Sequence, residues 1–276
     1  MWRKLLLPLV VTVILSALLA TSVDARTRRH WRPRPSPTPT PVVTPTPDTT
    51  QPTTNISGLP PVGYTVVDSS PVIDFSVAGD QGIVMLTRTD RYKLWGVLPE
   101  HARGVAVTTV EGVEAKLASL PYRVSWPVYD IENWDLTSEW EKANPPEATR
   151  QARAIADRYG AKLAVVPTLG IARQYGTKMA PYAHVFKVQS KGLQATSTPQ
   201  EFGATLNPLY DSLRAANPNM KVYADISPAP KGVQMTPDQL LAYWNAVKDH
   251  AQGISAWVAS SENEATFGAF LDKVGR

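Results

Sequence analysis

Two carboxylates stand two residues apart in one apolar, strand-like stretch of the chain. The stretch runs SWPVYDIENWDL over residues 125–136 and holds Asp130 and Glu132, with Trp126 and Trp134 on either side. Carboxyl groups this close shift each other's pKa, and burial raises their pKa values further. One acid can then stay protonated near neutral pH and act as a general acid while its neighbour stays charged. The pattern points to acid catalysis, with Glu132 as the acid and Asp130 as the residue that tunes it.

The direction of these side chains decides whether the pair can react. Side chains alternate along a strand, so Val128, Asp130 and Glu132 share one face. Tyr129 and Ile131 share the other. If the second face packs under helices, both carboxylates point into the interior of the fold, with Glu132 nearest its mouth. A purely structural role, in which either acid pairs with a Lys or Arg or caps a loop, stays open.

Polar residues on later apolar runs could line the same site. Lys187 and Gln189 share a face of the run HVFKVQ, and a charged and an amide side chain inside a buried strand indicate a polar pocket. Lys187 could instead form a salt bridge to either acid of the pair. Asp225, in KVYADI, is the best second carboxylate across the mouth, although a loop cap is the commoner role. Trp257, in ISAWVA, could stack on a sugar ring or belong to the core, as could Trp134.

Five short, mostly apolar runs in the second half of the chain predict strands buried on both faces. The predicted strands are residues 127–131, 162–167, 184–189, 221–226 and 254–259. Most lead into a helix that starts with a capping box, with Ser, Thr or Asn at the cap and Glu or Gln three residues later. The predicted caps are Asn144, Thr198, Thr236 and Ser261. Gly160 should end the first of these helices, and Pro208 should kink or split the second.

Strands that alternate with helices favour a parallel α/β fold over a sandwich. The first half adds predicted strands at 72–77, 82–86 and 104–109 and a helix at about 110–120. Eight strands suit a (β/α)8 barrel, the TIM-barrel fold. Because the first three are crowded into residues 72–109, we expect a barrel that is irregular in its first third, with early helices lost or replaced by loops. An open doubly wound sheet is the alternative.

The N-terminal region is organised differently. Residues 1–25 have a basic start, an apolar run and a small-residue cleavage signal, which is typical of a secretory signal peptide. An uncleaved membrane anchor is the alternative. Residues 26–58 are rich in Thr and Pro, cannot build a packed core and predict an extended linker. Residues 59–276 then form the barrel domain of a secreted protein.

Charge is divided unevenly between these regions. The whole chain carries +4, but residues 1–58 hold 7 basic and 2 acidic residues, which leaves 21 basic and 22 acidic residues in 59–276. A folded part with a net charge of −1 is not a nucleic-acid binder by charge. The arginine cluster at residues 26–34 could attract an anionic envelope surface, although a solvated start to the mature chain explains it as well.

The sequence lacks the motifs of several common enzyme classes. It has no cysteine, so it can form neither a disulfide nor a thiolate zinc site. It has no HExxH helix, GxSxG elbow or glycine-rich phosphate loop, and its 4 histidines have no metal spacing. We therefore expect no metal and no cofactor. We also expect a monomer, and the partner implied by the resemblance described next is a polysaccharide.

Several segments resemble a group of secreted bacterial barrels related to glycoside hydrolases. These are VYDIENW, KLAVVPTLGIA, HVFKVQSKGLQ and GISAWVA, within residues 121–259. The Asp-x-Glu at a strand end is also similar to the end of the family 18 chitinase signature and to the acidic pair of family 25 lysozymes. In such enzymes the Glu protonates the glycosidic oxygen, and the Asp helps to stabilise an intermediate formed by the substrate's own acetamido group. The resemblance implies Glu132 as the acid, Asp130 as the helper and Trp257 as the floor of the sugar site.

The resemblance departs from the chitinase signature at Trp126 and Val128, where the chitinases have further aspartates. Two hypotheses follow. The first is an exported glycoside-hydrolase-like enzyme that acts on a cell-wall or amino-sugar polysaccharide such as peptidoglycan or chitin. The second is a non-catalytic cell-surface barrel that holds a glycan or a partner. A salt bridge from Lys187 to Glu132 would favour the second, and Glu132 facing another carboxylate across an open pocket would favour the first.

Overall fold

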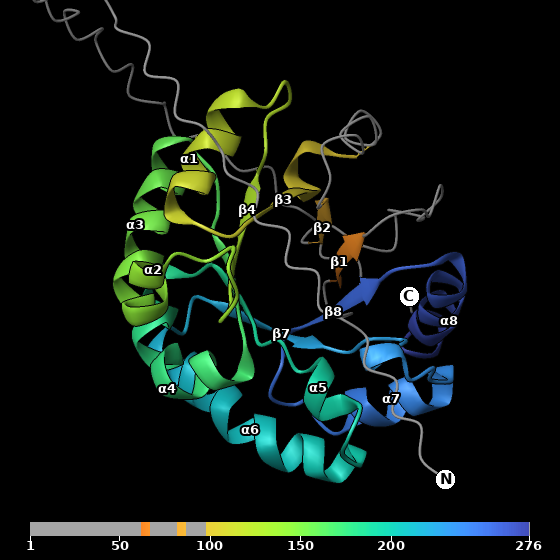
Figure 1. Cartoon of the computed structure of the whole chain (residues 1–276). Helices are drawn as coiled ribbons and strands as arrows, with labels where there is room; N and C mark the ends of the chain where they lie inside the picture. Colours follow the sequence, from red (N-terminus) through yellow and green to blue (C-terminus); the bar gives the residue numbers. More distant parts are fainter. Residues whose placement is uncertain (1–61, 67–81, 87–97, 276) are drawn as a thin grey trace, which may run out of the picture. The chain divides into compact units, whose positions relative to one another are not determined.

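Eight parallel strands close into a ring in chain order (Figure 1). The computed structural model describes residues 62–66, 82–86 and 98–275, which include every strand of this ring. The strands are β1 (Val62–Val66), β2 (Ile83–Leu86), β3 (Arg103–Val107), β4 (Trp126–Ile131), β5 (Ala164–Pro167), β6 (Val185–Lys187), β7 (Lys221–Asp225) and β8 (Gly253–Val258). Because β1 pairs with both β2 and β8, the sheet has no free edge. The fold is the (β/α)8 barrel that the sequence predicts, and the open doubly wound sheet is excluded.

The first strand of the barrel is not the predicted one. β1 is the segment VGYTV at 62–66, and residues 72–77, predicted as a strand, lie outside the described residues. The ring closes without them. Gly63 weakens the strand signal of this segment, because glycine in a strand interior usually marks a bulge or a close approach. Here a Cβ at Gly63 would lie 3.3 Å from the Tyr223 ring, so the glycine makes room for that ring inside the barrel.

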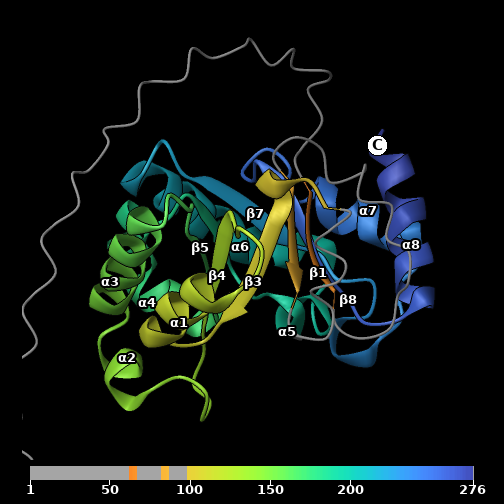
Figure 2. The ribbon, with the colours of Figure 1, turned by 90° about the horizontal axis from the view of Figure 1, so that it is seen from above.

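Helices cover the outside of the strands from β3 onward (Figures 1 and 2). The α-helices are α1 (Val110–Ser119), α2 (Glu139–Ala143), α3 (Pro145–Arg158), α4 (Leu169–Met179), α5 (Lys191–Gln194), α6 (Pro199–Ala216), α7 (Pro237–Asn245) and α8 (Ser261–Lys273). Short 3-10 turns are η3 (Glu100–Ala102), η4 (Ala180–Tyr182) and η5 (Pro230–Gly232). The connections after β1 and β2 fall mostly in 67–81 and 87–97, outside the described residues, so the absence of early helices stays a prediction.

The predicted signal peptide and linker, residues 1–58, also lie outside the described residues. Within the part of the chain that is described, no helix is both long and apolar enough to cross a bilayer.

Two of the predicted capping boxes form as expected. Thr198 and Thr236 each accept the backbone N–H three residues on, and the Glu or Gln at that position accepts the N–H of the cap. The box predicted at Asn144 is wrong, because its side-chain amide donates to the Trp140 carbonyl in the first turn of α2 and makes no cap bond. The last helix is capped by Ser260, one residue before the predicted Ser261.

The predicted helix stop at Gly160 is confirmed, and the predicted split at Pro208 is not. Gly160 adopts a positive φ of 65° directly after α3, a conformation that glycine reaches without strain. α6 instead runs as one helix through Pro208. Tertiary packing overrides the cost of the proline, because one face of α6 is buried: Phe202, Leu206, Tyr210 and Leu213.

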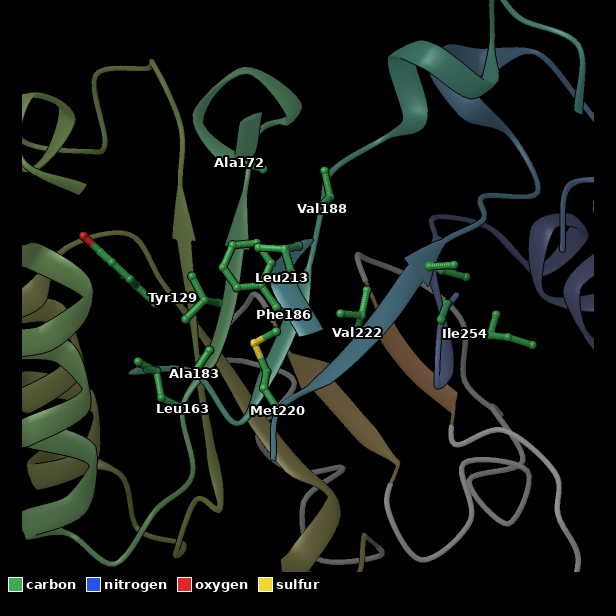
Figure 3. Close-up of a cluster of buried hydrophobic side chains, with 14 of the residues drawn as sticks. Tyr129, Leu163, Ala172, Ala183, Phe186, Val188, Leu213, Met220, Val222 and Ile254 are labelled. Carbon is green, nitrogen blue, oxygen red and sulfur yellow. The ribbon is translucent and has the colours of Figure 1, made fainter. Parts of the chain in front are cut away.

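Alternation along the strands sorts the apolar side chains into two clusters. The outer cluster lies between the strands and the helices, and Figure 3 shows part of it, with Phe186, Leu213 and Met220 close together. Each such side chain contributes roughly 1.5 to 3 kcal/mol through burial. The inner cluster fills the barrel interior and consists of Ile83, Met85, Trp126, Val128, Ala164, Val166, Val185 and Tyr223.

Glu141 on α2 ties three elements together just beyond the carboxyl end of β4. Its side chain is 1 % exposed. One carboxylate oxygen accepts the Val110 N–H at 2.5 Å and the Tyr129 hydroxyl at 3.1 Å, and the other accepts the N–H and hydroxyl of Ser138. Burial, and then the charge of Glu141, raises the pKa of the Tyr129 hydroxyl, which keeps it a donor. This carboxylate therefore fixes the start of α1 and α2 against β4.

We expect Glu141→Gln to destabilise the protein by about 2 to 3 kcal/mol, because its amide group would face the Ser138 donors and leave them unsatisfied in the interior. Urea unfolding at pH 7 measures the change. Glu139→Gln is the matched control, since Glu139 is on the same helix and makes only an exposed pair with Lys142. Equal stability of the two variants would show that the Glu141 contacts contribute little.

Candidate active site

The carboxylates of β4 project into the barrel. Trp126 and Val128 belong to the inner cluster, whereas Tyr129 and Ile131 belong to the outer one. Asp130 continues the inward series, and Glu132 follows directly after the strand. Both side chains are partly exposed. The alternation that the sequence predicts is therefore observed, and the pair lies at the carboxyl end of β4, where ligands collect in barrels of this fold.

The Gln189 side chain holds the two acids together. Its Nε2 donates to Asp130 Oδ1 at 2.6 Å and to Glu132 Oε1 at 2.9 Å, and it lies 3.2 Å from the Val166 carbonyl oxygen. Gln189 reaches the pair because it lies just beyond β6 and bridges to Thr168 beyond β5. The Gln189 amide has two N–H bonds, and the carboxyl groups of Asp130 and Glu132 accept both. The Val166 carbonyl oxygen is therefore a secondary contact.

The surroundings of Asp130 favour its protonated form. Burial raises the pKa of Asp130 to about 7, and the negative charge of Glu132 adds to the rise. The ammonium groups of Lys187 and Lys191 act in the opposite direction, and a hydrogen bond between the two carboxyl groups raises the pKa again. A carboxyl group with a raised pKa beside a second carboxyl group is an electrostatic arrangement that suits general acid catalysis.

Lys187 pairs with Asp225 and not with either acid of β4. Its Nζ lies 3.1 Å from Asp225 Oδ1, with Lys187 8 % exposed and Asp225 0 % exposed. The Ser190 N–H lies 3.2 Å from the other carboxylate oxygen. The interpretation that Lys187 bridges to Asp130 or Glu132 is therefore wrong.

The structure also places Asp225 differently from the expectation of a carboxylate facing across the mouth. Asp225 ends β7, the strand next to β6, so its side chain lies beside Lys187 inside the barrel. Asp225 is fully buried as the counter-ion of Lys187. It therefore does not have the loop-capping role that was the alternative expectation. Contact between Asp225 and a substrate stays a prediction.

Lys191 and Trp257 meet at the same end of the barrel. The Lys191 ammonium lies 4.3 Å from the centroid of the Trp257 ring, in a cation–π contact. Trp257 continues the inward series of Ser255 on β8, and its ring is partly exposed. The charge of Lys191 also lowers the pKa of Asp130. Lys191 therefore interacts with both Trp257 and the acidic pair. Lys191 was not among the predicted site residues, and only its place just after β6 could have indicated it.

Trp134 is held beside the pair through Thr137. The buried Thr137 hydroxyl accepts the indole N–H at 2.9 Å and the Glu132 backbone N–H at 3.4 Å. Trp134 is partly exposed, which leaves part of its ring open to a ligand. Thr137 therefore positions both the tryptophan and the backbone that carries the outer acid.

A small cavity of about 30 Å³ lies inside the barrel below the pair, lined by inward residues that include Val128, Lys187 and Tyr223. Such a space holds about one water molecule. Among the cavities formed by described residues, neither this one nor two larger ones elsewhere include Asp130 or Glu132 in their lining. The connections after β1 and β2 leave the barrel at this end and fall largely outside the described ranges, so only part of the rim is described.

Within the described ranges, no group of three or more His, Asp or Glu side chains is arranged to hold a metal ion. The groups gathered at the carboxyl ends of the strands are two carboxyls, an amide, an ammonium and two indoles. They can transfer a proton, donate hydrogen bonds and stack on an apolar ring face.

Comparison of the chain with known protein families and with curated proteins finds no match. Among solved structures, the chain is similar to a family 18 chitinase from Crocus vernus, with a TM-score of 0.49 and 11% sequence identity. The match covers 76% of this chain and 96% of the chitinase chain. The fold itself rests on the closed ring of eight parallel strands.

We expect Asp130→Asn to stabilise the protein at high pH. The Asn oxygen can accept from Gln189 and its amide can donate to Glu132, as the protonated acid does. Since the folded-state pKa of about 7 exceeds the ordinary 3.8, the folded protein binds the extra proton between these values and loses stability as the pH rises through them. The variant should therefore be more stable than the parent by about 2 to 4 kcal/mol at pH 8, with the gap closing near pH 4.

Denaturant unfolding from pH 4 to pH 8 measures this gap, with the exposed Asp249→Asn as the matched control. A gap that does not depend on pH would mean that Asp130 is ionised in the folded protein throughout this range.

Proposed function

We propose that this protein is a glycoside-hydrolase-like enzyme that cleaves O-glycosyl bonds of an amino-sugar polysaccharide, with Glu132 as the general acid. The observation that carries the proposal is the Asp130–Glu132 pair at the carboxyl end of β4, which Gln189 Nε2 joins, with the pKa of Asp130 raised to about 7. A barrel interior is otherwise a costly place for two adjacent acids. Their presence there, partly open to solvent, is the feature that a purely structural role explains least.

The proposed chemistry begins with the proton stored on Asp130. This proton moves through the hydrogen bond to Glu132, which gives it to the glycosidic oxygen. The bond from the anomeric carbon to that oxygen breaks, and its electron pair stays on the departing alcohol. The acetamido oxygen of the substrate then bonds to the anomeric carbon and closes a five-membered ring. Water loses a proton to Glu132 and bonds to the anomeric carbon, while the bond from that carbon to the acetamido oxygen breaks. Asp130, now ionised, stabilises the positive charge of the intermediate.

The substrate class rests on the resemblance of the strand-end acids and Trp257 to amino-sugar hydrolases. A cell-wall polymer such as peptidoglycan, or chitin, fits this class. The signal peptide predicted at residues 1–25 supports export, and the arginine cluster at 26–34 supports attraction to an anionic envelope. These segments lie outside the described residues, and export is part of the proposal.

A second candidate function is glycan or partner binding without cleavage. The observation that favours it is Lys191, which lies over the Trp257 ring and so covers a face on which a sugar would stack. The burial of Asp225 in an ion pair points in the same direction, since it leaves the β4 pair with no opposing carboxylate from the described part of the rim.

Hydrolysis of peptidoglycan fragments and chitin oligosaccharides by the purified full-length protein tests the two functions. We expect the parent protein to release new reducing ends and Glu132→Gln to lose about 100-fold or more of that rate, because its amide cannot donate an acidic proton. Glu262→Gln is the matched control, since Glu262 is exposed on α8, and it should keep the parent rate.

Equal rates for the parent and Glu132→Gln would remove Glu132 from the mechanism. Saturable binding of the same fragments with no release of reducing ends by the parent protein would establish the binding function instead.

A further inference from the structure

A second, larger cavity lies at the opposite end of the barrel from the acidic pair. Its volume is about 380 Å³, which lies within the usual range of small-molecule sites. Its lining comes from the amino ends of β4, β6 and β7 and from the loops that lead into them. The lining residues are His101, Ser125, Trp126, Gly160, Lys162, His184, Val185, Asn219, Lys221 and Tyr223.

The lining is basic and contains no acidic residue. Lys162 and Lys221 contribute two ammonium groups that repel each other: burial, and then the charge of Lys162, lowers the pKa of Lys221. Lys162 also lies over the Trp126 ring, 5.7 Å from its centroid. Neither lysine has a carboxylate partner within 4 Å among the described residues. Two cations that crowd one hollow without a counter-ion create a positive potential there.

His184 adds a directed donor to these two cations. Its Nδ1 accepts the Leu163 N–H at 3.0 Å, so the neutral ring must carry its proton on Nε2. Burial, and then the charge of Arg153, lowers the pKa of His184, which keeps the ring neutral and its tautomer fixed. The hydroxyl of Ser125 and the indole N–H of Trp126 are already committed to backbone carbonyls. Among these five residues (Lys162, Lys221, His184, Ser125 and Trp126), the side-chain donors that remain are thus two ammonium groups and one imidazole N–H.

We propose that this cavity binds a phosphate group, either as inorganic phosphate or as the phosphate of a small ester. A phosphate near neutral pH carries close to two negative charges and three strongly accepting oxygens. The charge matches Lys162 and Lys221, and the oxygens match three donors when the His184 N–H is included. Asn219 lies on the exposed side of the cavity, where an ester substituent would leave the site.

This inference is independent of the proposed glycosidase function. The two sites lie at opposite ends of the same strands and share no residue.

Isothermal titration calorimetry of the full-length protein with inorganic phosphate, at constant ionic strength, tests the proposal. We expect saturable binding, and a dissociation constant about tenfold higher for Lys162→Gln and for Lys221→Gln, the effect of removing one charge-assisted bond. Arg173→Gln is the matched control, since it removes the same charge from an exposed position near the start of α4, beyond the carboxyl end of β5, and should bind phosphate as the parent does.

Two further arms keep the test decisive. Glycerol phosphate in place of inorganic phosphate identifies the source, because tighter binding of the ester assigns the site to a phosphorylated small molecule. Histidine-selective NMR reports on His184 in the unmutated protein, and phosphate should shift its ring signals at the concentration that saturates calorimetry. Absence of saturable binding of either ligand, or an Arg173→Gln affinity reduced as much as that of Lys221→Gln, overturns the proposal.

Discussion

Alternation of side chains along β4 is the constraint on which the core and the candidate site both depend. A strand has a period of two, so a shift of one residue would turn both acids toward the helices and Tyr129 into the barrel. Tyr129 prevents this, because its hydroxyl is bonded to the buried Glu141. The pairing of Asp130 with Val166 on β5 then sets the depth of the acid in the barrel. The same contacts that pack the outer layer therefore aim the carboxylates inward.

The barrel interior changes from apolar to polar along the strands. The inner cluster fills the layers nearer the amino ends of the strands. Lys187 and Asp225 form a buried ion pair nearer the carboxyl ends. Breaking such a pair by removing one partner costs about 3 to 5 kcal/mol, because the other charge is left alone in a poor solvent. The pair therefore isolates the apolar filling from the titrating groups, and it fixes β6 against β7. The acids of β4 lie above a layer whose charges already balance.

The sequence predicts most of the barrel because its strands and helix starts carry local signals. Apolar runs and Thr-Pro caps are properties of neighbouring residues, and they locate β2 to β8 and two of the capping boxes. β1 was missed because Gly63 serves a distant ring, Tyr223, and a contact across the barrel leaves no local pattern. The split expected at Pro208 does not occur for a related reason, since the buried face of α6 outweighs the local cost of the proline.

The contacts of the candidate site also differ in whether they follow from local sequence or from distant packing. The inward direction of Asp130 and Glu132 follows from the strand period and was predictable. The partner of Lys187 was not, because it depends on strand order: β7 lies next to β6, whereas β5 separates β6 from β4. Gln189 reaches the acids because the chain beyond β6 stays beside Thr168, and its side chain spans β5 at the Val166 carbonyl. Such contacts require the closed ring to be known first.

Tyr223 is a shared wall between the two hollows of the barrel. Its side chain lines the small cavity under Lys187 and also the basic cavity at the amino ends of the strands, as does Val185. The two compartments are thus separated by about one aromatic ring. A smaller residue at position 223 would join the two cavities into one channel along the barrel axis. Water could then pass from the lysine-lined cavity to the space below the Asp130–Glu132 pair.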